Sequence, residues 1–176
     1  LPNDTISKTD FNKWFYPAAQ KDLIKNGAIY GVPLHIDTLG MYINSDSFQA
    51  AGLKPPTNWN DFINDSKTLT VKDSDGKIKT AGAALGTVDN INHAPDILSL
   101  LFLQNGVDMS NISSTGQSVT DALNFYTSFA LGNANVWDST LDTSLLAFTK
   151  GNLAMYFGYS WDYFAIKAAN PNLNFQ

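Results

Sequence analysis

The stretch AIYGVPLHIDTLGMYIN, residues 28–44, decides the fold predicted for this chain. Its two apolar runs, residues 28–34 and 39–44, are rich in residues that favour strands. Gly31 and Pro33 interrupt the first run, which therefore cannot be a plain amphipathic helix. The polar insert between the runs contains an imidazole and a carboxylate. We therefore predict two buried strands joined by a polar step, and open α/β folds bind ligands where the backbone leaves the sheet.

The composition limits the size of the domain and the class of partner. The 176 residues suffice for one domain with a hydrophobic core. Charged residues make up only 15% of the chain, against roughly 25% in soluble domains. Asn, Ser, Thr and Asp carry the remaining polarity, which suits hydrogen bonding to neutral polar ligands. The net charge of −5 and the absence of basic clusters argue against a nucleic-acid partner.

The sequence contains no cysteine and no long apolar run, which limits the kinds of site and segment that the chain can have. The chain contains no cysteine, which excludes disulfides, zinc–thiolate sites and cysteine nucleophiles. No apolar run approaches the ~20 residues of a membrane span, and the first residues lack the features of a signal peptide. The chain begins without Met and ends just after a predicted strand starts. We therefore expect both ends to continue into a longer chain.

Helical and strand patterns alternate along the rest of the chain. Asp75 and Gly76 predict a hairpin turn within residues 71–84, and Thr57 is the predicted N-cap of the preceding helix. This mixture predicts α/β architecture. The ranges predicted as helical are residues 11–24 (broken at Pro17), 47–51, 57–70, 97–103, 118–131, a helix from near 139 that buries Leu145, Leu146 and Phe148, and one from 161; residues 153–157 are a predicted strand.

Three segments in a fixed order carry a family resemblance. They are residues 30–33 with Asp37 and residues 41–44; Phe48, residues 51–53, 55–62 and 69–70; and residues 148–155 with Gly158 and Trp161. In this order and spacing they resemble the extracellular solute-binding proteins of ATP-driven sugar importers, the group that includes maltose-binding protein. The resemblance covers residues 28–161, most of the chain.

The resemblance implies an architecture as well as a function. Such proteins have two α/β lobes that close on a ligand. The chain resembles most of the C-terminal lobe, so we expect a single lobe of a two-lobe periplasmic-binding-protein-like (type II) fold, with a mixed sheet flanked by helices. Residues 1–30 would lead into the crossover between lobes, and residues 31–176 would form the ligand-binding lobe. The N-terminal lobe and the carboxy-terminal end of the full-length chain would be missing.

The polar insert supplies the first two candidate ligand-binding residues. The resemblance places Asp37 where the family often has a polar or acidic residue that binds a ligand hydroxyl, and a carboxylate accepts strong hydrogen bonds. The alternative is an aspartate that organises a turn. His35 lies two residues earlier, on the same face if the segment is extended. Its alternative role is a partly buried histidine bonded to the backbone.

Two aromatic residues follow the predicted strand at residues 153–157. The resemblance implies that Trp161 stacks against a sugar ring, because a flat indole buries the apolar face of a pyranose. A core tryptophan at the start of a helix is the alternative. Tyr159 is the neighbouring candidate. Trp59, in contrast, lies at the start of a helix in the family and is predicted to have a packing role.

Residues 87–93 lie where the family has a variable loop that contacts ligand. Asn90, Asn92 and His93 can donate and accept hydrogen bonds, which suits the recognition of hydroxyl groups. Loops rich in asparagine are also simply good turns. The three residues complete the set of candidate ligand-binding residues.

Catalysis has little support in the sequence. Asp37, Asp89, Asp96 and Asp162 could form a carboxylate pair of the glycosidase kind, but no spacing pairs them and the chain has no glutamate. Motifs for a serine nucleophile, a phosphate loop or a metal pair are missing. We therefore predict neither catalytic residues, nor a metal, nor a cofactor.

The predicted function is reversible carbohydrate binding in a cleft between lobes and delivery to the membrane permease of an ABC importer. The protein would be a periplasmic or extracellular monomer, with lipid anchoring of the full-length protein left open. Two alternatives remain: a glycan-active enzyme that uses an Asp pair, and a sensor or adhesion module that shares the fold.

Overall fold

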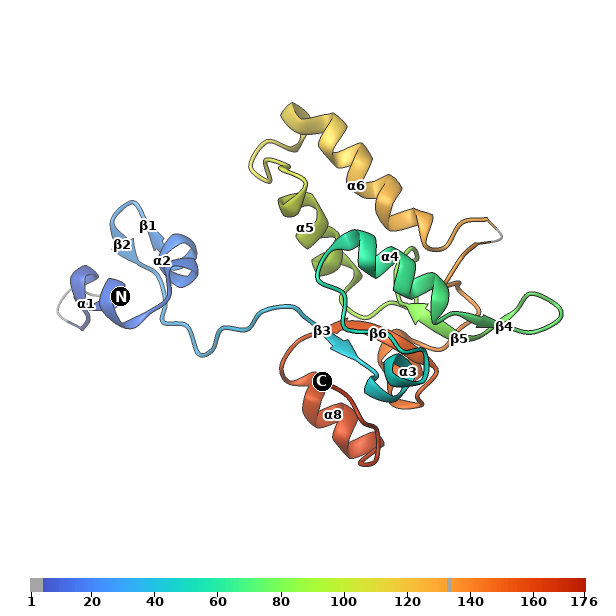
Figure 1. Ribbon diagram of the computed structural model, residues 1–176. Coiled ribbons are helices and arrows are strands. Elements are labelled where there is room, and N and C mark those ends of the chain that lie inside the picture. Colours follow the sequence, from blue (N-terminus) through green and yellow to red (C-terminus); the bar gives the residue numbers. More distant parts are fainter. Residues whose placement is uncertain (1–4, 133) are drawn as a thin grey trace. The chain divides into compact units, whose positions relative to one another are not determined.

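The computed structural model describes residues 5–132 and 134–176. The chain divides into two compact units, Leu1–Asp37 and Thr38–Gln176. The larger unit contains the four-stranded sheet of the fold, and its elements are labelled in Figure 1. In the part of the chain that the structure describes, no helix is long and apolar enough to cross a membrane.

The smaller unit consists of two short helices and a two-stranded hairpin. Helix α1 spans Lys8–Trp14 and α2 spans Pro17–Leu23, and the strands are β1, Ile24–Lys25, and β2, Ala28–Ile29. Pro17 occupies the first position of α2, where the missing N–H costs nothing, so the predicted interruption is the start of a second helix.

The strand predicted at residues 28–34 is wrong beyond Ile29. Only Ala28 and Ile29 pair with β1, and residues 30–37 have no regular structure. Pro33 has no N–H to donate to a ladder, which disfavours a paired strand at this position. Leu34 is 98% exposed rather than buried. The second predicted run is confirmed, because Gly40–Ile43 forms strand β3.

A mixed sheet forms the centre of the larger unit. Its strand order is β3-β6-β5-β4, in which β6 spans Leu153–Gly158, β5 spans Ile78–Ala83 and β4 spans Val71–Lys72. Strands β5 and β6 are parallel, and the other two pairs are antiparallel. Every residue of β6 is buried, as expected for a continuous apolar run that is covered on both faces. The prediction of a mixed sheet with helices is confirmed.

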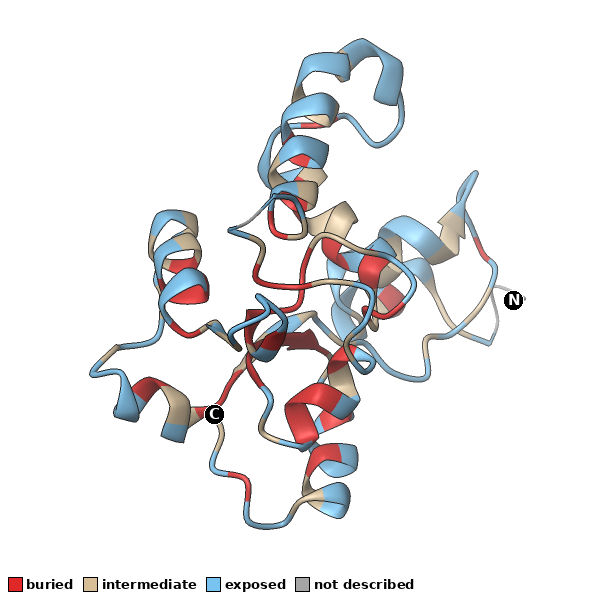
Figure 2. Cartoon of the chain, turned by 90° about the vertical axis from the view of Figure 1, so that its right-hand side faces the viewer, coloured by how far each residue is buried: buried red, intermediate tan, exposed pale blue. Residues whose placement is uncertain are grey.

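Helices cover this sheet. In Figure 2 the buried residues lie on the central strands and on parts of the neighbouring helices, whereas other parts of those helices are exposed. Helices α5 and α6 lie side by side (Figure 1). The helices of the larger unit are α3 (Ser45–Ala50), α4 (Trp59–Thr68), α5 (Ala94–Gln104), α6 (Gly116–Ser128), α7 (Ser144–Thr149) and α8 (Asp162–Ala169), with a 3₁₀ turn, η1, at Ile112–Thr115.

The helices predicted from residues 11, 47, 97 and 118 begin two or three residues earlier, at Lys8, Ser45, Ala94 and Gly116, and two other helices begin later than predicted. Asn58, not Thr57, caps α4, because its side-chain oxygen accepts a hydrogen bond of 3.0 Å from the backbone N–H of Asp61. The helix predicted from near residue 139 begins only at Ser144, and Leu146 is exposed on it rather than buried. The hairpin of β4 and β5, by contrast, is antiparallel as predicted.

Candidate functional site

A group of polar and aromatic side chains lies where β6 leads into α8 and where the loop before α5 ends. Its members, which we call the His93–Trp161 cluster, are His93, Tyr156, Tyr159, Trp161 and Asp162. All five belong to the larger unit. Three of them are candidates predicted from the sequence, so the structure brings His93, Tyr159 and Trp161 together.

The aromatic members form a stacked surface. The rings of Tyr159 and Trp161 are 4.4 Å apart between centroids and inclined by only 21°. The imidazole of His93 meets Tyr159 edge-on, at 4.9 Å and 86°, and lies 6.4 Å from Trp161. Trp161 remains 46% exposed to solvent. The cluster therefore presents a partly exposed indole whose position is set by two neighbouring rings.

A buried carboxylate lies beneath this surface. The Oδ2 atom of Asp162 accepts hydrogen bonds from the hydroxyl of Tyr156 at 2.9 Å and from the backbone N–H of Tyr159 at 3.1 Å. The Nε2 atom of His93 lies 3.2 Å from the same oxygen. Burial, and next the hydrogen bond to Asp162, raise the pKa of the Tyr156 hydroxyl well above its ordinary value, so this group stays a neutral donor.

The sequence did not predict Asp162 as part of a binding site. From the sequence alone, Asp162 is only a possible member of a carboxylate pair. The available signal was its position directly after Trp161, at the start of a helix. Its partner His93 is 69 residues away in the chain, and spacing along the sequence does not reveal such a contact.

Gly158 leaves the space that this arrangement needs. A Cβ atom at this position would lie 2.4 Å from the Oδ2 of Asp162 and 2.6 Å from the Cε1 of Tyr156. Both distances are shorter than van der Waals contact, so a larger residue would displace the carboxylate or the phenol ring. Gly158 was among the residues that carry the family resemblance, and here its role is close packing.

His93 reaches the cluster through an uncommon backbone conformation. Its φ of 61° and ψ of 22° lie in the left-handed region, where a residue other than glycine is strained. It is the N-cap of α5, and its carbonyl oxygen accepts a hydrogen bond of 3.0 Å from the N–H of Ile97. The interaction with Asp162 on one side and this bond on the other hold the residue in place.

The amide of Asn90 is used within the protein. Its Nδ2 donates to the carbonyl oxygens of Asp138 at 2.9 Å and Leu141 at 3.2 Å, and its Oδ1 accepts from the indole N–H of Trp137 at 3.0 Å. The residue is buried. The structure therefore gives Asn90 a role in holding the loop, and its predicted contact with ligand stays a prediction.

Asn92 has a similar structural role. Its Oδ1 accepts hydrogen bonds from the hydroxyl of Ser144 and from the N–H of Leu145, both at 3.1 Å. The backbone N–H of Asn92 in turn donates to the Ser144 hydroxyl at 2.8 Å. These bonds connect the loop at residues 87–93 to the start of α7 and so help to set the position of His93.

His35 and Asp37 belong to the smaller unit. Both lie in the segment without regular structure that follows β2. His35 is exposed and lines a cavity of about 530 Å³ in this unit, together with Trp14, Phe15, Leu23 and Leu34 among others. Their predicted contacts with ligand stay predictions.

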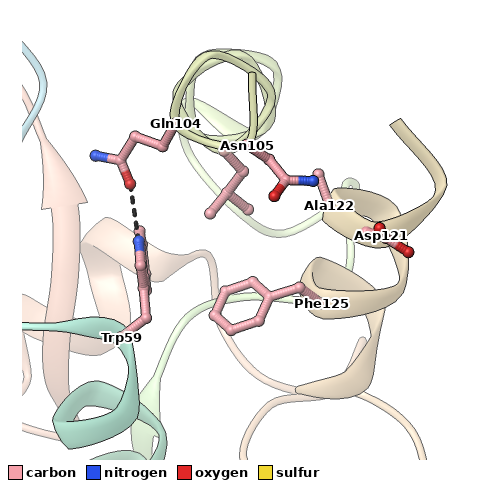
Figure 3. Close-up of a pocket in the computed structure, with 7 residues that line it drawn as sticks. Trp59, Gln104, Asn105, Asp121, Ala122 and Phe125 are labelled. Carbon is pink, nitrogen blue, oxygen red and sulfur yellow. Dashed lines mark hydrogen bonds between the residues drawn. The ribbon is translucent and has the colours of Figure 1, made fainter. Parts of the chain in front are cut away.

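A separate pocket lies between α4, α5 and α6 (Figure 3). It has a volume of about 260 Å³, and Trp59 and Phe125 form part of its wall. The indole N–H of Trp59 donates a hydrogen bond of 2.8 Å to the Oε1 of Gln104, while its ring packs against Phe62 and Phe125. Trp59 thus connects three helices, in agreement with the packing role predicted for it.

The described residues contain no group of three or more His, Cys, Asp or Glu side chains that could hold a metal ion.

Comparisons with known proteins assign the chain to a family. A family model described as bacterial extracellular solute-binding protein matches residues 3–176, which confirms the resemblance predicted from the sequence. None of the curated proteins compared with the chain matches it.

Solved structures share the fold. The maltose/maltodextrin-binding domain MalE from Bdellovibrio bacteriovorus, bound to maltotriose, matches with a TM-score of 0.74 and 20% identity over 100% of this chain and 45% of its own. A solute-binding protein of an ABC transporter from Thermotoga lettingae TMO, bound with alpha-D-tagatose, has a TM-score of 0.71 and 20% identity, over 95% of this chain and 45% of its own.

A third match has a ligand of a different class. UgpB from Mycobacterium tuberculosis, in complex with glycerophosphocholine, matches with a TM-score of 0.69 and 20% identity over 97% of this chain and 41% of its own. The chain therefore spans less than half the length of the solved structures that it matches.

Proposed function

The chain belongs to the bacterial extracellular solute-binding proteins, and we propose that it forms one side of a carbohydrate-binding cleft. The observation that carries this proposal is the indole of Trp161, which is half-exposed and stacked on Tyr159. An indole face buries the apolar side of a sugar ring, while polar groups at the edge of the ring bind its hydroxyls. His93 supplies such a group beside Trp161.

Composition and fold support the same class of ligand. Only 15% of the residues are charged, which favours a neutral polar solute over a polyanion. Two of the proteins that share the fold are bound to sugars, maltotriose in one and tagatose in the other. His35, Asp37, Asn90 and Asn92 remain proposed contacts for ligand hydroxyls.

The proposal includes the transport step. Residues 31–176 would act as a C-terminal-type lobe, and residues 1–30 would lead into the crossover from a second lobe. The chain spans about 45% of the sugar-bound structures that it matches, which supports this division. Closure of the two lobes on the sugar would present a joint surface to the permease of an ABC importer, outside the cytoplasm. Capture would be reversible, without turnover of the sugar.

A thermal-shift panel on the intact gene product tests the class of ligand. The probes are maltotriose, D-tagatose, mannotriose and glycerophosphocholine. A ligand at about 100 times its Kd stabilises the folded state by about 2.7 kcal/mol, so a bound sugar raises the melting temperature by several degrees. We expect at least one sugar to do so. A shift with glycerophosphocholine alone would contradict the carbohydrate assignment, and release of reducing sugar from maltotriose would favour the enzyme.

A further inference from the structure

We propose that Asp162 positions the binding surface by holding His93 in the tautomer with the proton on Nε2. The Nδ1 atom of His93 would then accept a hydrogen bond from a ligand hydroxyl beside Trp161. The ligand part of this inference rests on the proposed function. The tautomer is a property of the chain alone and is tested without any ligand.

The hydrogen bonds to Asp162 determine which ring nitrogen of His93 carries a proton. A single oxygen, Oδ2, is within 3.2 Å of the Tyr159 backbone nitrogen, the Tyr156 hydroxyl and the His93 Nε2. The backbone N–H can only donate, and the buried phenol of Tyr156 keeps its proton. An ionised carboxylate accepts from all three groups and donates to none, so the Nε2 of His93 carries a proton.

A second carboxylate competes for the same imidazole. The Oδ2 of Asp96 lies 3.9 Å from the Nδ1 of His93, which is too long for a hydrogen bond. The side chain of Asp96 is half-exposed, whereas that of Asp162 is buried. Because a buried charge is screened less by solvent, Asp162 has the stronger influence on the imidazole.

The two carboxylates determine whether the Nδ1 atom of His93 accepts or donates a hydrogen bond toward a ligand. In the neutral imidazole with its proton on Nε2, the Nδ1 atom has a lone pair and accepts a hydrogen bond. The ring centroids of His93 and Trp161 are 6.4 Å apart, so a hydrogen-bond acceptor on the imidazole lies beside the indole. Without Asp162, the remaining carboxylate of Asp96 favours a proton on Nδ1, which turns the acceptor into a donor.

Nitrogen NMR of histidine tests the tautomer directly. The chain has two histidines, His35 and His93, and the nitrogen signals that disappear in a His93→Gln variant are assigned to His93. At pH 8.5 we expect a protonated Nε2 and an unprotonated Nδ1 on His93 in the intact gene product. The opposite pattern would overturn the proposal, and this spectrum decides the tautomer even if a variant of Asp162 fails to fold.

Two matched variants separate the carboxylates. Asp162→Asn and Asp96→Asn each remove one negative charge beside His93. We expect Asp162→Asn to shift the two nitrogen signals toward a mixture of tautomers, and Asp96→Asn to leave them as in the wild type. Tyr156→Phe, which keeps Asp162, should retain the Nε2 proton. Unchanged nitrogen signals in a folded Asp162→Asn protein would contradict the positioning role.

Calorimetric titration with maltotriose adds the ligand. We expect Asp162→Asn to weaken binding about tenfold and Asp96→Asn to change it less than twofold. Wild-type affinity in Asp162→Asn would overturn the positioning of the ligand contact. If no sugar of the panel binds while the Nε2 tautomer is found, the carbohydrate proposal fails and the role of Asp162 toward His93 stands.

Discussion

The hydroxyl of Tyr42 donates a hydrogen bond of 2.7 Å to the carbonyl oxygen of Tyr159. Tyr42 belongs to β3, and the pairing of β3 with β6 ends at Gly40 and Gly158, one residue before Tyr159. The bond therefore continues the connection between these strands beyond the ladder itself. As a result, the stacked rings of Tyr159 and Trp161 are held by the central sheet.

The Tyr42→Phe variant should lose this connection. A hydrogen bond within a folded protein contributes about 1 kcal/mol. The carbonyl oxygen of Tyr159 keeps the hydrogen bond of 3.0 Å that it accepts from the N–H of Asp162, so no unpaired group adds to the loss. We expect the free energy of unfolding in urea to fall by about 1 kcal/mol. Tyr163→Phe is the control, because this half-exposed tyrosine in α8 should tolerate the change within about 0.5 kcal/mol. Equal losses in both variants would argue against the role of the Tyr42 hydroxyl.

Replacement of Gly158 by alanine should disturb the His93–Trp161 cluster. The added methyl group would overlap the Oδ2 of Asp162 and the ring of Tyr156. Overpacking of this kind costs about 1–3 kcal/mol of stability. Gly116→Ala is the matched control, since Gly116 lies in α6 with a helical backbone and nothing near its Cβ position. There we expect a gain of about 0.4–1 kcal/mol in thermal or urea unfolding. Wild-type stability in Gly158→Ala would contradict the close packing.

The Asn90→Asp variant tests the structural role of the loop. It removes the two hydrogen bonds donated to Asp138 and Leu141 and leaves a buried carboxylate beside two carbonyl oxygens. We expect a loss of at least about 2 kcal/mol in the free energy of unfolding. Asn124→Asp makes the same chemical change at an exposed position of α6 and should cost less than about 0.5 kcal/mol. Similar losses of unfolding free energy in the two variants would show that the side chain of Asn90 does not stabilise the loop.

Alkaline pH should weaken the fold through Tyr126. Burial raises the pKa of its hydroxyl from 10.0 to about 12, because the charged phenolate is disfavoured inside the protein. The protonated form is thus favoured in the folded state, and its contribution is fully present below pH 10 and lost as the pH rises toward 12. Unfolding in urea at pH 9.0 and 11.5 should show a smaller loss of stability in Tyr126→Phe than in the wild type. Parallel losses would contradict this origin of the pH dependence.

The sequence predicted the central sheet better than it predicted the structure of residues 28–44. Strand β6 was predictable because a short, continuous apolar run is typical of a strand whose sheet is covered on both faces. Residues 30–34 are also apolar, but a run of strand-forming residues does not reveal whether a partner strand exists. In the structure residues 30–34 form no strand, so Asp37 is not flanked by two buried strands.

The candidate site was predictable only in part for a similar reason. Trp161 and Tyr159 are near neighbours in the chain, and the family resemblance was enough to select them. His93 joins them through Asp162, across a separation of 69 residues that no local pattern records. Asn90 and Asn92 were selected for their chemistry, but a side-chain amide suits a protein carbonyl as well as a sugar hydroxyl, and only the fold shows which one is near.

We propose that the half-exposed indole of Trp161 binds a sugar. Calorimetric titration of the intact gene product with maltotriose and with D-tagatose, in the wild type and in Trp161→Ala, tests it most directly. Phe164→Ala is the control, because Phe164 is an exposed aromatic residue outside the His93–Trp161 cluster. We predict that Trp161→Ala weakens binding of the sugar at least about tenfold while Phe164→Ala leaves it unchanged. Equal sugar affinity in the wild type and in Trp161→Ala would contradict the account.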